Sequence, residues 1–318
     1  MISLNYLMII DFFIAFFTVF YLSKKFIRKS YENGLTVKDM YKKNRPDIPC
    51  LGGLLIMAGV VVSLIFFQLF TALMIPLLIF YFLVLTFALF GLTDDIFGFK
   101  MRFDKVIALL FLAIPIALLT RDTTLNLIFT TIDIGWMFAF IIAPVYVMVV
   151  ANLVNMHSGF NGLAAGTTLI MLIFTFLKVL MIGKTETLFI LVPILGSLSA
   201  FLYFDFYPSR IFLGNVGSFL IGSALGAFLV INNMLWFGVT ILIPHIINFL
   251  MWVYWKATMH KNRFAKFGRL NVDGTIEPPN NLTLKFLVAN IFKTNEWQTV
   301  LFCYGLTTVF CVLGLILF

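Results

Sequence analysis

The sequence predicts an all-α integral membrane protein, a bundle of about ten transmembrane helices that forms one polytopic domain over residues 1–318. Two observations carry this prediction. Hydrophobic residues make up 62% of the chain and charged residues only 11%, and the mean hydropathy is +1.05. A soluble domain carries about 25% charged residues, because its surface must meet water. The composition therefore excludes an ordinary cytosolic enzyme, a disordered chain and a secreted disulfide scaffold.

Apolar windows long enough to cross a bilayer recur along the whole chain. The first window has no basic segment before it and no small-residue cleavage site after it, so we expect a retained span and not a signal peptide. The predicted helices cover residues 4–23, 50–69, 74–92, 105–120, 136–152, 167–182, 187–203, 216–231, 236–254 and 299–317.

The basic residues predict the orientation of the bundle. When the connections alternate between two sides, only Arg121, Lys178 and Lys184 of the 22 Lys and Arg residues fall on the poorer side. The positive-inside rule makes the richer side cytoplasmic and places both termini outside. Residues 255–298 form the longest cytoplasmic connection. Because this topology explains the net charge of +8 and no basic domain is present, we expect no nucleic acid partner.

Two connections have the residue pattern of short β-hairpins. Residues 125–135 are rich in β-branched side chains, which favours a small hairpin or a segment packed along the membrane surface. NVDGTIEPPN at 271–280 predicts a tight turn followed by an extended Pro-Pro segment. The three cysteines, Cys50, Cys303 and Cys311, share no metal-binding spacing and are interpreted as structural or incidental.

Two adjacent carboxylates, Asp94 and Asp95, end the third predicted span in GLTDDIFGFKMRFDK. Neighbouring carboxylates at a membrane boundary repel each other unless a cation or a proton relieves them. One interpretation is a turn solvated by the cytoplasm. The other is a site for Mg²⁺ or phosphate, since carboxylate oxygens suit hard cations and Lys100, Arg102 and Lys105 add positive charge nearby.

Amide side chains gather in ANLVNMHSGFNGLAAG, residues 151–166, which contains Asn152, Asn155, His157 and Asn161. Asn152 and Asn155 are three apart and share one face of a helix. Such amides are often only caps, and the glycines only allow helices to approach. We favour a binding role, because the segment lacks Lys and Arg and because amides beside glycines can approach a nucleotide closely.

The segment FYPSRIFLGNVGSFLIG, residues 206–222, combines a lone base, Arg210, with the aromatic Phe212 and the glycine-flanked Asn215 at the start of a span. A helix N-terminus that faces a cytoplasmic cleft suits an anion, and Phe212 could stack on a base. The alternative is an interfacial aromatic residue beside an arginine that reaches the membrane surface.

Two further cytoplasmic segments are basic. In residues 256–281, the bases His260, Arg263, Lys266 and Arg269 recur at three-residue spacing, which predicts one stripe for a pyrophosphate and a lipid phosphate, or simply contact with anionic lipid. Residues 37–53 join a basic run to Gly52 and Gly53, either as a loop that caps a helix or as the lining of a polar cleft.

Taken in this order, the segments resemble the polyprenyl-phosphate N-acetylhexosamine-1-phosphate transferase superfamily, most closely its dolichyl-phosphate GlcNAc-1-phosphate transferase branch of archaeal type. The matching pieces are DMYKKNRPDIP, GLTDDIFG, NLVNMHSGFNGLAAG and YPSRIFLGN. Asn215 departs from the pattern, since the family often has aspartate there. The last cytoplasmic loop lacks the three-histidine signature of the phospho-MurNAc-pentapeptide branch, which argues against that substrate.

The resemblance implies roles for the candidate residues. Mg²⁺, or Mn²⁺ in its place, would be held by Asn155 and Asn215, and Asp94, Asp95 and Lys105 would be catalytic, with Lys105 at the lipid phosphate. Asn161 would contact uracil and Phe212 would stack on it. The remaining substrate-binding candidates are Asn152, Arg210, His260, Arg263, Lys266 and Arg269.

The reaction that the resemblance implies is transfer of GlcNAc-1-phosphate from UDP-GlcNAc to dolichyl or another polyprenyl phosphate with release of UMP, the first step of N-glycan or related glycan assembly. The enzyme would lie in the bilayer of a prokaryotic, archaeal-type plasma membrane with its active site facing the cytoplasm, as a monomer or a homodimer. Two alternatives stay open: the same chemistry on another UDP-N-acetylhexosamine, and a transporter or flippase for a lipid-linked sugar, although the polar motifs gather at one face and not at the midplane.

Overall fold

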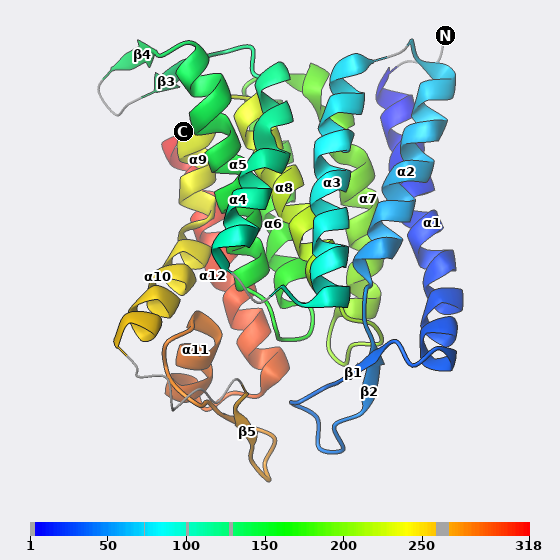
Figure 1. Ribbon diagram of the computed structural model, residues 1–318, viewed down its shortest axis with the longest axis vertical. Helices are drawn as coiled ribbons and strands as arrows, with labels where there is room; N and C mark the ends of the chain where they lie inside the picture. The colour runs from blue at the N-terminus through cyan, green and yellow to red at the C-terminus, as the bar shows by residue number, and fades with distance from the viewer. Residues whose placement is uncertain (1–3, 73, 100–101, 127–129, 259–266) are drawn as a thin grey trace.

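The computed structural model describes residues 4–72, 74–99, 102–126, 130–258 and 267–318 and shows a bundle of roughly parallel and antiparallel helices (Figure 1). Its helices are α1 (Leu4–Glu32), α2 (Gly53–Phe70), α3 (Ile75–Phe97), α4 (Arg102–Ala113), α5 (Ala143–Met156), α6 (Leu163–Met181), α7 (Leu188–Asp205), α8 (Gly214–Ile231), α9 (Leu235–Ile241), α10 (Ile243–Thr258), α11 (Leu284–Phe292) and α12 (Glu296–Leu317). Short helical turns are η1 (Ile114–Leu118), η2 (Phe138–Ile142) and η3 (Thr185–Thr187).

The all-α membrane class is supported, but with fewer straight spans than the ten expected. Among the described residues, eight helices are long and apolar enough to cross a membrane, and the pair α9 and α10, bent by 66°, raises the number to nine. The expected span at 105–120 is divided into α4 and η1, with Pro115 in the first turn of η1. Pro244 follows the break between α9 and α10, where proline cannot donate a helical hydrogen bond.

Helix α8 lies inside the bundle, with 83% of its apolar window buried, the largest share among these spans. It packs against α3, α5 and α2. A Cβ on Gly53 would lie 2.1 Å from the backbone nitrogen of Gly217, and a Cβ on Gly91 would lie 2.4 Å from the carbonyl oxygen of Asn215. Glycine is therefore required at both crossings, and the first turn of α8 is held directly against α2 and α3.

Three short antiparallel hairpins close the connections: β1 (Thr36–Lys38) with β2 (Asp47–Pro49), β3 (Thr124–Asn126) with β4 (Thr131–Asp133), and β5 (Arg269–Leu270) with β6 (Ile276–Glu277). The hairpins expected at 125–135 and 271–280 are confirmed, whereas β1 with β2 was not expected. Hairpin β1–β2, strand β5 and helix α11 lie at one end of the bundle, and the marked chain ends lie toward the other, with β3 and β4 (Figure 1).

Candidate active site

Five of the predicted site residues lie together at the end of the bundle that carries β1, β2 and α11. We call Asp94, Asp95, Lys105, Asn155 and Asn215 the Asp94 cluster; its members come from α3, α4, α5 and α8. The amino group of Lys105 lies 2.7 Å from the Asp94 carboxylate. The side-chain nitrogen of Asn215 donates to the same carboxylate at 3.1 Å. The structure thus brings together residues up to 121 positions apart in sequence.

Asp95 faces the N-terminus of α8. Its two carboxylate oxygens accept hydrogen bonds from the backbone N–H groups of Asn215, at 3.1 Å, and Val216, at 3.0 Å. The first N–H groups of a helix have no partner within the helix, and a carboxylate there also interacts favourably with the helix dipole. Asp95 therefore caps α8 from a neighbouring helix and fixes the position of Asn215.

Asn155 connects α5 to α8. Its side-chain nitrogen donates to Asn215 Oδ1 at 2.7 Å and to the hydroxyl of Ser218 at 2.8 Å. Ser218 was not singled out from the sequence; it lies one turn after Asn215 on the same face of α8, and that spacing is the signal that could have revealed it. The amide oxygen of Asn155 takes no part in either bond.

The Asp94 cluster is rich in oxygen donors and carries one more negative than positive charge. Asp94 is 7% exposed, so its charge depends on Lys105 and on the neighbouring amides for compensation. Magnesium takes carboxylate and amide oxygens, and it keeps open positions for substrate phosphates or water. Among the described residues, no group of three or more His, Cys, Asp or Glu could hold a metal; two members of this cluster are asparagines. The carboxylate and amide oxygens of the Asp94 cluster therefore suit a divalent cation that also binds a diphosphate.

A second polar group, the Glu296 network, surrounds Asn161 and consists of Asp39, Lys42, Asn161 and Glu296. The backbone N–H of Asn161 donates to Glu296 at 2.8 Å, and its side chain donates to Asp39 at 3.1 Å. Lys42 lies 2.6 Å from Glu296 and 3.2 Å from Asp39. These contacts tie the hairpin β1–β2 and the start of α12 to the loop after α5.

Sequence analysis missed three members of this network. Asp39 and Lys42 lie in the segment 37–53, which the sequence predicts either to cap a helix or to line a polar cleft without singling out either residue, and Glu296 lies just before the last predicted span. Lys42 also lies over the ring of Tyr207, 3.9 Å from its centroid. Burial raises the pKa of the adjacent Tyr41 to about 12. Glu296 is only 2% exposed at the start of α12. Its importance can be recognised only once its partner Lys42, 254 positions away, is known.

Other candidates lie apart from the Asp94 cluster. Asn152 donates to the carbonyl of Met148 on its own helix. Arg210 donates to the carbonyl of Tyr203 and lies over the rings of Tyr203 and Phe204. Phe212 is half-buried, and its backbone N–H donates to Pro49 at 2.9 Å while its carbonyl accepts from Gly52 at 2.9 Å.

The expected basic stripe does not reach Arg269. Helix α10 ends at Thr258, and Arg269 lies on strand β5, where side chains alternate with a period of two and not three. This part of the prediction was wrong, because the turn and the Pro-Pro segment draw the chain into a hairpin. His260, Arg263 and Lys266 lie outside the described residues.

A family model supports the interpretation of these motifs. The model for glycosyl transferase family 4 matches residues 77–233, which include α3, α5 and the whole of α8. A protein of Saccharolobus solfataricus is 30% identical over 319 residues, which cover 97% of this chain and 95% of the relative. The chain belongs to glycosyl transferase family 4. The polyprenyl-phosphate N-acetylhexosamine-1-phosphate transferase superfamily expected from the motifs is therefore confirmed.

The relatives differ in name. The Saccharolobus protein and one from Sulfolobus acidocaldarius, 31% identical over 90% of this chain and 88% of its own, are provisionally named UDP-N-acetylglucosamine–dolichyl-phosphate N-acetylglucosaminephosphotransferase. A phospho-N-acetylmuramoyl-pentapeptide-transferase from Acetivibrio thermocellus is 32% identical over 63% of this chain and 65% of its own. The two archaeal proteins align over nearly the full chain, and this supports the archaeal dolichyl branch.

Proposed function

We propose that this chain transfers GlcNAc-1-phosphate from UDP-GlcNAc to dolichyl phosphate or a related polyprenyl phosphate and releases UMP, the first step of N-glycan or related lipid-linked glycan assembly. The observation that carries the proposal is the Asp94 cluster: two carboxylates, a lysine and two amides from four helices, at one end of a membrane bundle. The likeness to the two archaeal relatives over most of the chain supports the choice of substrates.

The reaction exchanges one phosphate bond for another. A phosphate oxygen of the lipid attacks the β-phosphorus of UDP-GlcNAc, the bond between that phosphorus and the bridging oxygen breaks, and the electron pair leaves with UMP. Such transfers depend on in-line positioning and on neutralisation of charge more than on covalent participation by the protein. A buried cluster of fixed charges and dipoles provides both.

We assign different tasks to the two aspartates. Asp95 has both oxygens bound by N–H groups of α8, so we propose that it positions Asn215. Asp94 faces Lys105, and we propose that it acts beside the reacting groups. Lys105 is about one quarter exposed, and it binds an oxygen of the lipid phosphate. Asp94 holds the Lys105 amino group in place for this contact.

Magnesium is the metal that the donor set suits. Asn155 and Asn215 would hold it through their amide oxygens, and the Asp94 carboxylate would be its charged ligand. When bound, the ion supplies charge neutralisation on the diphosphate and on the departing UMP. Because Asn215 replaces the aspartate often found in the family, the site has one negative charge fewer, and Mn²⁺ is an alternative occupant.

The Glu296 network is proposed to bind the uridine end of the substrate. The backbone and side-chain nitrogen atoms of Asn161 donate to Glu296 and Asp39, and we propose that its amide oxygen accepts a hydrogen bond from a ring N–H of the base. We propose that the half-buried Phe212 stacks on the same base. We further propose that this end of the bundle faces the cytoplasm, because the basic residues concentrate in its connections.

The test is a transfer assay with purified protein in detergent. Labelled UDP-GlcNAc and dolichyl phosphate should give a lipid-linked product that requires Mg²⁺ and disappears with EDTA. UDP-GalNAc and undecaprenyl phosphate in parallel reactions define the sugar and lipid. Well-folded protein that forms no product with any of these pairs would contradict the proposal and favour a transporter.

A further inference from the structure

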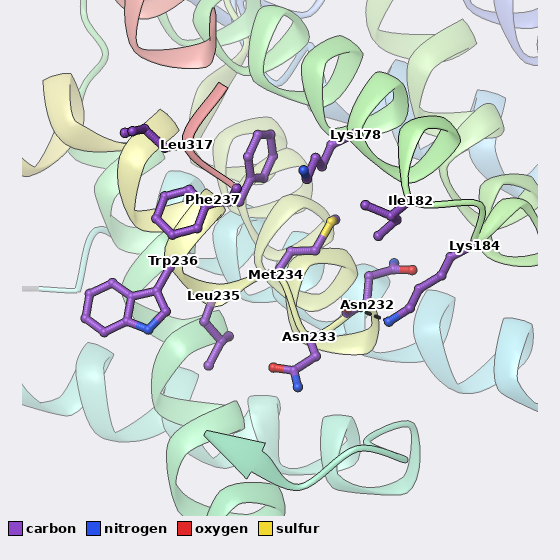
Figure 2. A pocket seen from close by; sticks show the side chains of 11 residues that line it. Lys178, Ile182, Lys184, Asn232, Asn233, Met234, Leu235, Trp236, Phe237 and Leu317 are labelled. Carbon is purple, nitrogen blue, oxygen red and sulfur yellow. Dashed lines mark hydrogen bonds between the residues drawn. The ribbon is translucent and has the colours of Figure 1, made fainter. Parts of the chain in front are cut away.

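A second pocket lies at the opposite end of the bundle from the Asp94 cluster. It has a volume of about 680 Å³ and is bounded by the end of α6, the loop between α8 and α9, and the end of α12. Figure 2 shows its lining side chains. Asn215 opens α8 and Asn232 follows its end, so the two sites are separated by about 25 Å along the helix.

Lys178 is the most unusual residue of this pocket. It lies in the last turn of α6 and is only 6% exposed. Among the described residues, no hydrogen bond or ion pair reaches its amino group, and Figure 2 shows the side chain extending from α6 into the pocket. A buried charge without a partner is unfavourable, and the dipole of α6 offsets only part of this. The amino group is therefore available to an anion that enters from outside.

A second cation lies at the rim. The amino group of Lys184 donates to the backbone carbonyl of Asn232 at 3.2 Å. Asp122, which accepts a hydrogen bond from Asn233 at 2.7 Å, offsets part of the Lys184 charge. The described side chains that line the pocket thus include two lysines and no carboxylate, which favours an anionic ligand.

The remaining wall is apolar and open. Trp236 is 38% exposed and Leu317 is 65% exposed, whereas Phe237 is buried behind them. Lysines at helix ends and tryptophan are typical of the level of the lipid head groups. A hydrocarbon chain lying over Trp236 and Leu317 would cover this surface, while a small soluble anion would leave it exposed.

We propose that this pocket binds an anionic membrane phospholipid, with the phosphate on Lys178 and Lys184 and a chain against Trp236 and Leu317. The site is separate from the proposed active site and does not depend on the reaction. It gives the enzyme a preference for anionic lipid at the end of the bundle that lacks the catalytic motifs.

Thermal unfolding of the full chain in neutral detergent tests the proposal, with Lys178→Met as the variant and Arg121→Gln as the control that removes a charge at the same end. Dispersed phosphatidylglycerol should raise the unfolding midpoint of the unaltered protein and of Arg121→Gln by several degrees. Lys178→Met should lose most of that rise. Phosphatidylcholine and inorganic phosphate should change no midpoint.

If Lys178 only stabilised the fold, Lys178→Met would be less stable than the unaltered protein even without lipid. Without added lipid, Lys178→Met should be at least as stable as the unaltered protein, because an unpartnered buried charge is removed. The proposal is overturned if Lys178→Met unfolds at a lower temperature in neutral detergent, if it keeps the full response to phosphatidylglycerol, or if inorganic phosphate stabilises the unaltered protein as well as the lipid does.

Discussion

Replacing Asn215 by aspartate tests the electrostatics of the Asp94 cluster. The substitution restores the residue often found in the family at this position and keeps the size of the side chain. In the structure, Asn215 donates a hydrogen bond to Asp94 and accepts one from Asn155. The first bond becomes a contact between two carboxylates, while the second is retained.

The distance sets the size of the effect. The nitrogen of Asn215 lies 3.1 Å from Asp94 Oδ2, and two unit charges at that separation repel by about 5 kcal/mol at an effective dielectric constant of about 20. Rotation of the new side chain, its protonation and the nearby Lys105 reduce this value. We expect Asn215→Asp to lower the free energy of unfolding by about 2 kcal/mol when no metal is present.

A bound cation should reverse the loss. A third carboxylate strengthens the attraction for Mg²⁺, so the Mg²⁺ concentration that gives half of the maximal transfer rate should fall about tenfold, equivalent to about 1.4 kcal/mol. Thermal unfolding in EDTA and in Mg²⁺, with a Mg²⁺ titration of activity, measures both effects. Asn290→Asp is the matched control, because Asn290 lies beside Lys293 on α11, outside the cluster.

The opposite result is an Asn215→Asp variant that is as stable as the unaltered protein in EDTA and needs the same Mg²⁺ concentration. That result would mean that Asn215 and Asp94 do not share a cation.

Three further predictions concern stability. Asp95→Asn removes one of two acceptors at the start of α8 and should lower stability by about 1 to 2 kcal/mol; an unfolding midpoint equal to that of the unaltered protein would contradict the capping role. Gly53→Ala places a Cβ against Gly217 and should lower the free energy of unfolding by about 1 to 3 kcal/mol, which denaturant or thermal unfolding can check; no loss would mean that α2 and α8 are not in contact there. Burial, aided by the charge of Lys285, lowers the pKa of His157 from 6.5 to about 4. As the pH falls, the histidine therefore takes up a proton in the unfolded chain before it does so in the folded protein, and the free energy of unfolding should fall by up to about 3 kcal/mol between pH 6.5 and 4. His157→Gln should flatten this pH dependence, and an unchanged pH profile would exclude His157 as its source.

Much of the helical framework could be predicted from the sequence, because a bilayer requires long apolar segments and these are visible one window at a time. The division of residues 105–120 into α4 and η1 was not predicted, because the apolar window continues through Pro115, which lies in the first turn of η1, just after the α-helix ends. The hairpins at 125–135 and 271–280 follow local turn chemistry and were found. Hairpin β1–β2 is held by contacts with α1 and with the loop before α8, which no local pattern reveals.

In the candidate site, too, some residues have a local signal in the sequence and others depend on long-range contacts. Asp94 and Asp95 stand out because two adjacent carboxylates at a membrane boundary repel each other, and Asn155 and Asn215 stand out because they are amides beside glycines at the ends of apolar spans. Asp39, Lys42 and Glu296 do not, because each looks ordinary until the fold brings it to a partner 122 to 254 positions away. Arg210 was predicted as a substrate-binding candidate because it is the only base of its connection, and in the structure its guanidinium lies over Tyr203 and Phe204.

We propose that the Asp94 cluster carries out metal-dependent phosphate transfer. Exchange of labelled UMP into UDP-GlcNAc by purified protein, in the presence of dolichyl phosphate, tests it most directly because a transporter cannot make or break this bond. We expect exchange that requires Mg²⁺ and that persists in Arg121→Gln at the far end of the bundle. Exchange should be lost in Asn155→Ala, while phosphatidylglycerol should still raise the unfolding midpoint of that variant, which shows that it is folded. Absence of exchange from the unaltered folded protein, or full exchange by Asn155→Ala, would contradict the account.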